Sequence, residues 1–470
     1  MLGGVPIKGK CIDRYRLNAG SEYGAPIDGI LDPSSEVPQH LIEELDDLVK
    51  FKRSTLATFG YQRYAGWSAY TAELRANTYG RFFGAILASP RSEIAGLGVP
   101  RSHITMALMA FPAVSDWFLR WAEKRRGFYT RYEFNTLTDV ASLLRENTGW
   151  IRQHPELALR LAPIPGIVTR ADIRKARKDW GGCCATTLVF LRSKLRELRR
   201  IYRPHRDPFE PILPVLNSDG PLAQYRKIAD EILRHMPNEK QDPIRAAEAV
   251  RDYLIFRFGM HLGFRQRNFR ELLLCMPGHK KRGDLTLREM RRGEIRWSEV
   301  DNAWEVFVPS QAFKNWDSFF FKHRAFRHLL PDLENLYFWI DAYINRHRSV
   351  LLRGSADPGT FFVRKMRRKT TTTSMDTAAF YFVWRDVIAR FGIYNPYTKR
   401  GAIEGILPHG PHSVRDVIAT HVLKQTASYD LAAFAIQDTP DMVKTCYGRF
   451  LPEEKVGLAA KVLNRVWEPS

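Results

Sequence analysis

The chain has few cysteines and no long apolar run. Its 470 residues contain five cysteines, too few and too scattered for a disulfide framework or for paired CxxC metal motifs. The N-terminal region lacks the apolar core of a signal peptide, and no run of about 18 apolar residues is present to cross a bilayer. These shortages argue against a disulfide-stapled or membrane-spanning protein. We therefore expect a cytoplasmic protein with reduced thiols. The cysteines are Cys11, Cys183, Cys184, Cys275 and Cys446.

Negative charge is also scarce. Lys and Arg number 72 against 51 Asp and Glu, giving a formal net charge of +21. A single basic cluster is ordinarily a solvated surface, but many clusters with few compensating acids favour a polyanionic partner, most simply nucleic acid. A membrane surface is the weaker alternative, because no strongly amphipathic basic helix stands out. The basic clusters lie at 124–126, 170–178, 192–206, 280–282 and 364–369.

Apolar residues are plentiful and occur at helical spacing in the first half. They make up 44% of the chain, and aromatic residues 12%, enough to bury substantial cores. Residues 1–40 are rich in Gly, Pro and polar residues and are interpreted as an N-terminal arm or capping segment. Residues 41–202 carry apolar positions at i, i+3, i+4 and i+7, which predicts a helical domain. Helices are expected at 40–59, 69–89, 102–126, 136–151 and 183–202.

A proline-rich stretch separates this region from a mixed second half. Residues 203–220 contain four prolines and two turn signals, typical of a linker. In the region 221–470, the runs 293–300 and 302–313 are rich in Trp, Val, Ile and Phe and are predicted to pair as strands. A third strand is expected within 318–330. The predicted fold is α+β and mostly α: a helical domain followed by a mixed domain with a small antiparallel sheet.

The motif His412-Ser-Val-Arg415 lies 32 residues before Tyr447. Residues three apart on a helix share one face, so His412 and Arg415 combine an acid/base group with a planar fork of donors suited to phosphate. The phenol of Tyr447 is a candidate nucleophile. Alone, an HxxR motif is a weak signal in a chain of this length.

An arginine further upstream gives the motif weight. The run GMHLGFRQRNFRELLL places Arg265 two residues after Gly263. Taken alone, Arg265 is interpreted as an ion-pair partner of Glu271 or as a surface residue. Taken in order, this arginine, a lysine at a β-turn, HxxR and the later tyrosine resemble the tyrosine recombinase (phage integrase) family. The resemblance covers about residues 220–460 and extends weakly into the helical region, which is similar to the family's core-binding domain.

The resemblance implies roles for particular residues. Arg265 and Arg415 match the two arginines that hold the scissile phosphate, where guanidinium donors stabilise the charge of the transition state. Tyr447 matches the nucleophile that forms a 3′-phosphotyrosyl link. Because the arginines supply positive charge, the resemblance implies no metal and no cofactor.

Two further residues match groups that transfer protons in the family. Lys314 matches the hairpin lysine that protonates the leaving 5′-oxygen. A solvated turn lysine is the alternative, with Lys322 as a rival for the role. His412 matches the histidine that assists proton transfer or holds the phosphate, and a buried, hydrogen-bonded core histidine is its alternative.

Asp438 departs from the family pattern. It stands where a histidine is usual, and Gln437 stands where glycine is usual. A carboxylate repels phosphate, but it can accept a hydrogen bond, orient a neighbour, or cap the helix that begins near Thr439. Both interpretations of Asp438, helix cap and active-site member, stay open at this stage.

The expected activity is DNA breaking and rejoining. By resemblance, the partners are double-stranded DNA, further protomers in a synapse of four, and accessory proteins in some systems, and the location is the nucleoid. The usual occupation of the family is integration or excision of a mobile element. Two alternatives remain: a type IB topoisomerase, and a non-catalytic DNA-binding protein in which Asp438 marks a decayed site. The grouping of His409, His412 and His421 lacks an acidic partner at metal-ligating spacing.

Overall fold

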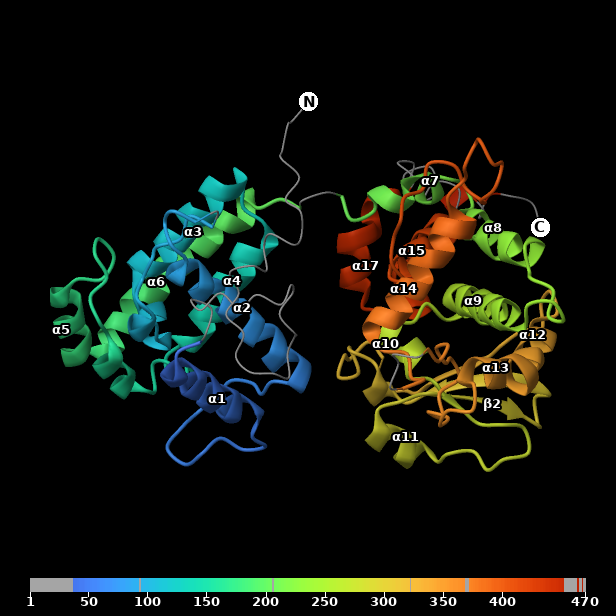
Figure 1. Ribbon diagram of the computed structural model, residues 1–470, viewed down its shortest axis with the longest axis horizontal. Helices are drawn as coiled ribbons and strands as arrows, with labels where there is room; N and C mark the ends of the chain where they lie inside the picture. The colour runs from blue at the N-terminus through green and yellow to red at the C-terminus, as the bar shows by residue number, and fades with distance from the viewer. Residues whose placement is uncertain are drawn as a thin grey trace. The chain divides into compact units, whose positions relative to one another are not determined.

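The computed structural model divides the chain into two compact units, Met1–Arg206 and Asp207–Ser470 (Figure 1). It describes residues 37–92, 94–204, 207–321, 323–367 and 372–451, together with 463, 464 and 467. Residues 1–36 of the expected arm lie outside this described part, and so does Lys322.

The first unit is built from helices that begin at clear capping residues. Thr130 and Glu133 form a capping box at the start of α4, and Thr169 and Asp172 form another at α5, so orphan backbone N–H groups are satisfied. Gly127 ends α3 in the left-handed region at φ 77°. The helices are α1 (Gln39–Arg53), α2 (Ala69–Leu87), α3 (Pro112–Arg126), α4 (Arg131–Leu143), α5 (Arg170–Lys178) and α6 (Trp180–Ile201), with 3₁₀ turns η3 (Arg101–His103), η4 (Met106–Ala110) and η5 (Pro155–Arg160).

One predicted helix starts later than expected. The apolar pattern predicted a helix over 102–126, but its first part forms η3 and η4, and α3 begins only at Pro112. Proline has no N–H and clashes with the preceding turn, so it is tolerated in the first turn of a helix and not in its interior. The residues before it are nevertheless core: Met106, Leu108 and Met109 are fully buried.

The expected linker overlaps the division between the units but is partly packed. The division falls between Arg206 and Asp207. Beyond it, Phe209, Ile212 and Leu216 join the apolar core of the second unit. The prolines of this stretch therefore serve short packed turns, η6 (Glu210–Ile212) and α7 (Leu213–Leu216).

The second unit surrounds one long buried helix, α9. Fourteen of its residues are buried, because α8, α13, α14 and α15 all contact it (Figure 1). The helices not yet given are α8 (Pro221–Arg234), α9 (Pro243–Leu262), α10 (Gln266–Arg270), α11 (Asp284–Met290), α12 (Leu336–Ala342), α13 (Arg348–Leu352), α14 (Thr377–Val387), α15 (Ser413–Thr426), α16 (Tyr429–Ile436) and α17 (Pro440–Tyr447). They are joined by the 3₁₀ turns η7 (Ser310–Ala312) and η10 (Gly448–Phe450) and by the π-helical segments η8 (Tyr343–His347) and η9 (Ile388–Gly392).

A four-stranded sheet completes this unit, in the order β1-β2-β3-β4. The three longer strands are antiparallel, as predicted: β2 (Glu294–Ser298), β3 (Ala303–Val308) and β4 (Phe326–Leu329). The two-residue strand β1 (Leu273–Leu274) adds to β2 in parallel, so the sheet as a whole is mixed. The mostly helical α+β class is confirmed.

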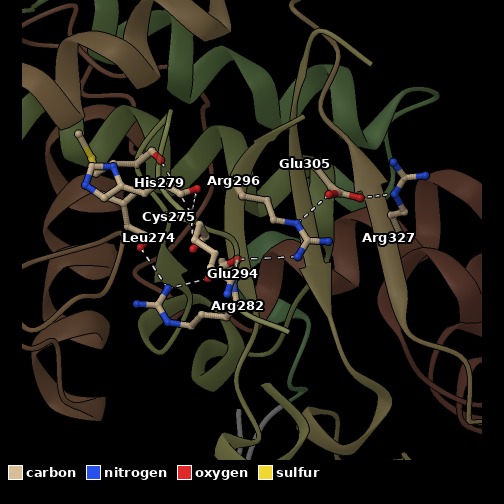
Figure 2. Close-up of polar contacts among 10 residues, drawn as sticks. Leu274, Cys275, His279, Arg282, Glu294, Arg296, Glu305 and Arg327 are labelled. Atoms are coloured by element: carbon tan, nitrogen blue, oxygen red, sulfur yellow. Dashed lines mark hydrogen bonds and ion pairs between the residues drawn. The ribbon is translucent and has the colours of Figure 1, made fainter. Parts of the chain in front are cut away.

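Two buried glutamates of the sheet are paired with arginines, and one of them, Glu305, joins three strands (Figure 2). Arg282 donates to Glu294 at 2.6 Å, and Arg296 donates to Glu305 on the facing strand at 2.8 Å. Arg327 of β4 also donates to Glu305. A buried carboxylate is tolerated only when it is paired, so these contacts favour a single register for β2, β3 and β4. They thereby position the β3–β4 loop, which carries Lys314 and Asn315.

Among the helices of the described residues, none combines the length and apolar character needed to cross a bilayer.

Candidate active site

A turn at Gly263, at the end of α9, positions the first arginine of the site. Gly263 ends the helix at φ 56°, and a Cβ at this position would lie 2.4 Å from the backbone oxygen of Ala435. Only glycine fits such a close approach in the left-handed region. The turn places Arg265 at the start of α10, where its guanidinium faces the α16–α17 connection.

The second arginine comes from α15 and is held by the same turn. Arg415 is 1% exposed, and its Nη1 donates to the Gly263 carbonyl at 2.6 Å. Burial and the nearby charge of Arg265 lower its pKa to about 10, so the guanidinium remains charged at neutral pH. Its Nε has no hydrogen-bond acceptor among the described residues.

Asp438 lies between the two arginines. Its Oδ2 accepts from Nη2 of Arg265 at 2.6 Å and from Nη2 of Arg415 at 3.1 Å. The residue that caps α17 is Thr439, with no side-chain cap bond. Asp438 thus lies one residue before the cap and sits among the site residues. The role of this carboxylate in a reaction stays a prediction.

Gln437 occupies a backbone position that favours glycine. It ends α16 in the left-handed region at φ 51°, where glycine carries no Cβ penalty. Its backbone oxygen accepts from Nη1 of Arg265 at 3.4 Å. The same turn that ends α16 therefore presents both a carbonyl and the Asp438 carboxylate to one guanidinium.

The β3–β4 loop reaches the same cluster. Asn315 donates from Nδ2 to Oδ1 of Asp438 at 2.8 Å, which uses the second carboxylate oxygen. The preceding residue, Lys314, is exposed, and its charge contributes to the electrostatics of His412. The loop therefore brings an ammonium group to the rim of the site.

His412 caps the start of α15 and is neutral at neutral pH. Desolvation, followed by the positive charges of Arg415 and Arg265, lowers its pKa to about 4, although the side chain reaches the surface. The alternative interpretation, a buried core histidine, does not fit this exposed position. A neutral imidazole can either donate or accept a proton within a hydrogen bond.

Tyr447 ends α17 with its phenol turned into the protein. The side chain is 6% exposed, its ring packs on Phe209, and its Oη donates to Oδ1 of Asp416 at 2.7 Å. Burial and the Asp416 carboxylate raise the pKa of the phenol, while Arg415 opposes that rise. Tyr447 and Arg415 are therefore close enough to interact electrostatically.

Two contributors were missed from the sequence, Asp416 and Asn315. Asp416 directly follows Arg415, so its place beside a motif arginine was an available signal. Asn315 had no signal beyond its place next to Lys314. In the described part of the chain, no group of three His, Cys, Asp or Glu side chains is arranged to hold a metal ion.

Comparisons with known proteins give a fold likeness only. No family model matches the chain, and no curated protein matches it. Among solved structures, the post-cleavage complex of the XerH site-specific recombinase with palindromic difH substrate is 11% identical, covering 70% of this chain and 85% of that one at a TM-score of 0.35. The XerH pre-cleavage complex with difH substrate is 10% identical, covering 76% and 85% at a TM-score of 0.34. Scores of this size leave the function to be decided by the residues of this chain.

Proposed function

We propose that this protein is a site-specific DNA recombinase that cleaves and rejoins strands through a phosphotyrosyl intermediate on Tyr447. The observation that carries the proposal is the convergence of Arg265 and Arg415 on one carboxylate oxygen. Two guanidinium groups from distant parts of the chain thereby form a preorganised oxyanion site. A non-bridging phosphate oxygen has the charge and size to replace that carboxylate oxygen.

The bond changes follow from the residues at the site. The Tyr447 oxygen attacks phosphorus and forms a 3′-phosphotyrosyl link, and the bond to the 5′-oxygen breaks. Lys314 gives a proton to that leaving oxygen, and His412 binds or relays protons as a neutral imidazole. The two arginines hold the charge of the pentacoordinate transition state, so the proposed step needs no metal and no cofactor. The reverse step rejoins a strand because the link conserves the phosphodiester energy.

The charge of the chain fits duplex DNA as the substrate. A net charge of +21 supports phosphate contacts on a scale that makes binding strongly salt-dependent. We include in the proposal a helical DNA-binding role for the first unit, a four-protomer synapse, accessory proteins where the site requires them, and integration or excision of a mobile element. The corresponding location is the nucleoid.

A covalent-trapping experiment tests this proposal. A tiled set of nicked duplexes, covering the DNA that flanks the gene, lets the cleaved 5′-hydroxyl fragment diffuse away and traps the protein on the strand. We expect a covalent band that persists in EDTA and is lost in Tyr447→Phe. The matched control is Tyr397→Phe, since Tyr397 is 95% exposed in the same unit. An unchanged band in Tyr447→Phe would sink the assignment.

Strand transfer separates recombination from simple relaxation. A recombinase joins strands between two DNA molecules that carry its site. A type IB topoisomerase forms the same covalent link but only relaxes supercoils. Relaxation of a plasmid with no transfer between two duplexes would therefore favour the topoisomerase.

A further inference from the structure

We propose that Asp416 is a catalytic residue of this site, the acceptor of the Tyr447 proton as the phenol oxygen attacks phosphorus. The inference rests on the proposed function and deepens it, because it assigns the destination of a proton that any attack by tyrosine must release. Its basis is the hydrogen bond from Tyr447 Oη to Asp416 Oδ1, 2.7 Å long and buried from solvent. Asp416 thus touches the reacting atom directly.

Helix geometry points the side chains of the adjacent residues Arg415 and Asp416 toward different partners. Consecutive residues on a helix point in directions about 100° apart. On α15, Arg415 accordingly faces Asp438 and Gly263, while Asp416 faces α17 and the phenol. One helix therefore presents a phosphate-binding cation and a proton acceptor in a fixed relation to each other.

The acceptor of the phenol proton is not His412. Among the described contacts, the partner of Tyr447 Oη is Asp416, whereas the charges that act on His412 include those of Arg415, Arg265 and Lys314. A carboxylate also has an advantage as the base. It is negative before the reaction, so taking a proton next to an incoming phosphate lowers the charge repulsion.

The groups around Asp416 suit proton transfer near neutral pH. Burial raises its pKa to about 7, and the Tyr447 bond and Arg415 limit that rise. From α8, Tyr225 also faces this region: burial, with a smaller contribution from the Asp416 charge, raises the pKa of Tyr225, whose Oη is bonded to His409 Nε2 at 2.9 Å. His409 itself is neutral at neutral pH, because burial lowers its pKa to about 4.

The proton balance is complete within the site. As the Tyr447 oxygen–phosphorus bond forms, the phenolic O–H breaks and its proton moves to Asp416 Oδ1. The phosphorus–5′-oxygen bond breaks, and Lys314 protonates the leaving oxygen. In the joining step the proton on Asp416 returns to the departing phenol oxygen, and Lys314 takes the proton of the attacking 5′-hydroxyl. No oxidant, reductant or further reactant takes part.

The first test compares Asp416→Asn with Asp441→Asn in the covalent-trapping assay on nicked duplexes. Asparagine keeps the shape and can hold the phenol, but cannot take its proton. We expect adduct formation to slow by about 100-fold or more in Asp416→Asn, the scale of general base catalysis. Asp441 is an exposed carboxylate on the same helix as the tyrosine, so the Asp441→Asn rate should stay at the wild-type value. Duplex binding by fluorescence anisotropy reports whether each variant is folded.

A second measurement isolates proton removal from structure. Replacing Tyr447 with a difluorotyrosine makes the phenol more acidic, so the fluorinated Asp416→Asn protein should recover at least tenfold in rate, while the fluorinated wild type changes little. A merely structural role for Asp416 predicts no such selective rescue. If Asp416→Asn does not fold, the wild-type pH profile decides: the adduct rate should rise with pH and level off near pH 7, and a flat profile from pH 5 to 8 would overturn the inference.

The outcomes separate the two proposals. Absence of any wild-type adduct, or its persistence in Tyr447→Phe, overturns both. A Tyr447-dependent adduct that forms in Asp416→Asn within threefold of the wild-type rate overturns only the role of Asp416. A faster adduct in Asp416→Asn also overturns it, because the carboxylate would then be restraining the tyrosine.

Discussion

Nη2 of Arg265 donates to Oδ2 of Asp438 at 2.6 Å, although 173 residues separate the two along the chain. This contact sets the carboxylate at the position where the proposed chemistry requires a phosphate oxygen. In the protein without DNA, Asp438 therefore neutralises the arginines, and a scissile phosphate has to displace its oxygen or share the donors.

Removing this charge is expected to strengthen DNA binding. Asp438→Asn should bind duplex DNA about fivefold more tightly at 0.1 M salt, which corresponds to about 1 kcal/mol for losing one like-charge contact at a protein edge. Fluorescence anisotropy with a labelled duplex measures the affinity. Asp441→Asn changes the net charge by the same amount at an exposed position and serves as the control. Equal affinities for the two variants would contradict the placement of Asp438 at the phosphate site.

Gly263 should not tolerate a side chain. Gly263→Ala adds a Cβ 2.4 Å from the Ala435 oxygen at φ 56°, so both strain and a backbone clash result. We expect a loss of more than about 1 kcal/mol in the free energy of unfolding. Chemical denaturation measures this loss. The control is Gly278→Ala, since Gly278 has φ 77° but no atom within 4 Å of its Cβ position, and therefore reports the conformational strain alone. Equal losses in the two variants would rule out the clash.

The two arginines should differ in their effect on stability. Lysine lacks the fork of donors, so Arg265→Lys and Arg415→Lys should each slow adduct formation by about 100-fold or more. Arg415 is also the buried donor to the Gly263 carbonyl, and leaving that oxygen unpaired costs about 1–3 kcal/mol. Only Arg415→Lys should therefore lower the thermal midpoint clearly. A larger drop in the thermal midpoint for Arg265→Lys than for Arg415→Lys would contradict this structural role of Arg415.

Asp416 should make stability depend on pH. Its pKa rises from 3.8 to about 7 on folding, because the carboxylate is buried. Between these two pH values the folded protein binds more protons than the unfolded chain. The stabilisation that Asp416 contributes is therefore fully present below about pH 4 and is lost as pH rises to about 7. The upper limit is about 4 kcal/mol, at about 1.4 kcal/mol for each pKa unit.

Asp416→Asn removes this titration. Relative to wild type, the variant should therefore gain stability on going from pH 5 to pH 8, as measured by urea denaturation at both values. The difference between Asp441→Asn and wild type should not change with pH in the same way. A wild-type to Asp416→Asn difference that is constant over this range would place the Asp416 pKa near its ordinary value.

Local patterns predicted most elements of the fold. The helices at 69–89 and 183–202 appear as α2 and α6, and the strands appear as β2, β3 and β4. The prediction failed at 102–111, where an apolar pattern stands before Pro112 and the segment folds into buried 3₁₀ turns. Apolar spacing reports burial, and the proline decides where the α-helix begins.

The sequence named residues of the candidate site but not their contacts. The resemblance to a family pattern singled out Arg265, His412 and Arg415 and the turn lysine Lys314, and their roles stay a prediction. The sequence left Asp438 open between a helix cap and a site member, since both interpretations accept hydrogen bonds. The choice depended on where α9, α15 and the α16–α17 turn meet, which no local pattern encodes.

The sequence by itself determined the chemistry available to this protein: two arginines, a histidine, a lysine and a tyrosine in a family-like order, on a strongly basic chain. Only the tertiary structure decided how these groups pair. Helix packing brought Asp438 onto both arginines and Asp416 onto Tyr447, across 173, 23 and 31 residues of chain. Hydrogen bonds act over about 3 Å, so pairings between residues this far apart are set by how the buried helices pack and not by sequence spacing.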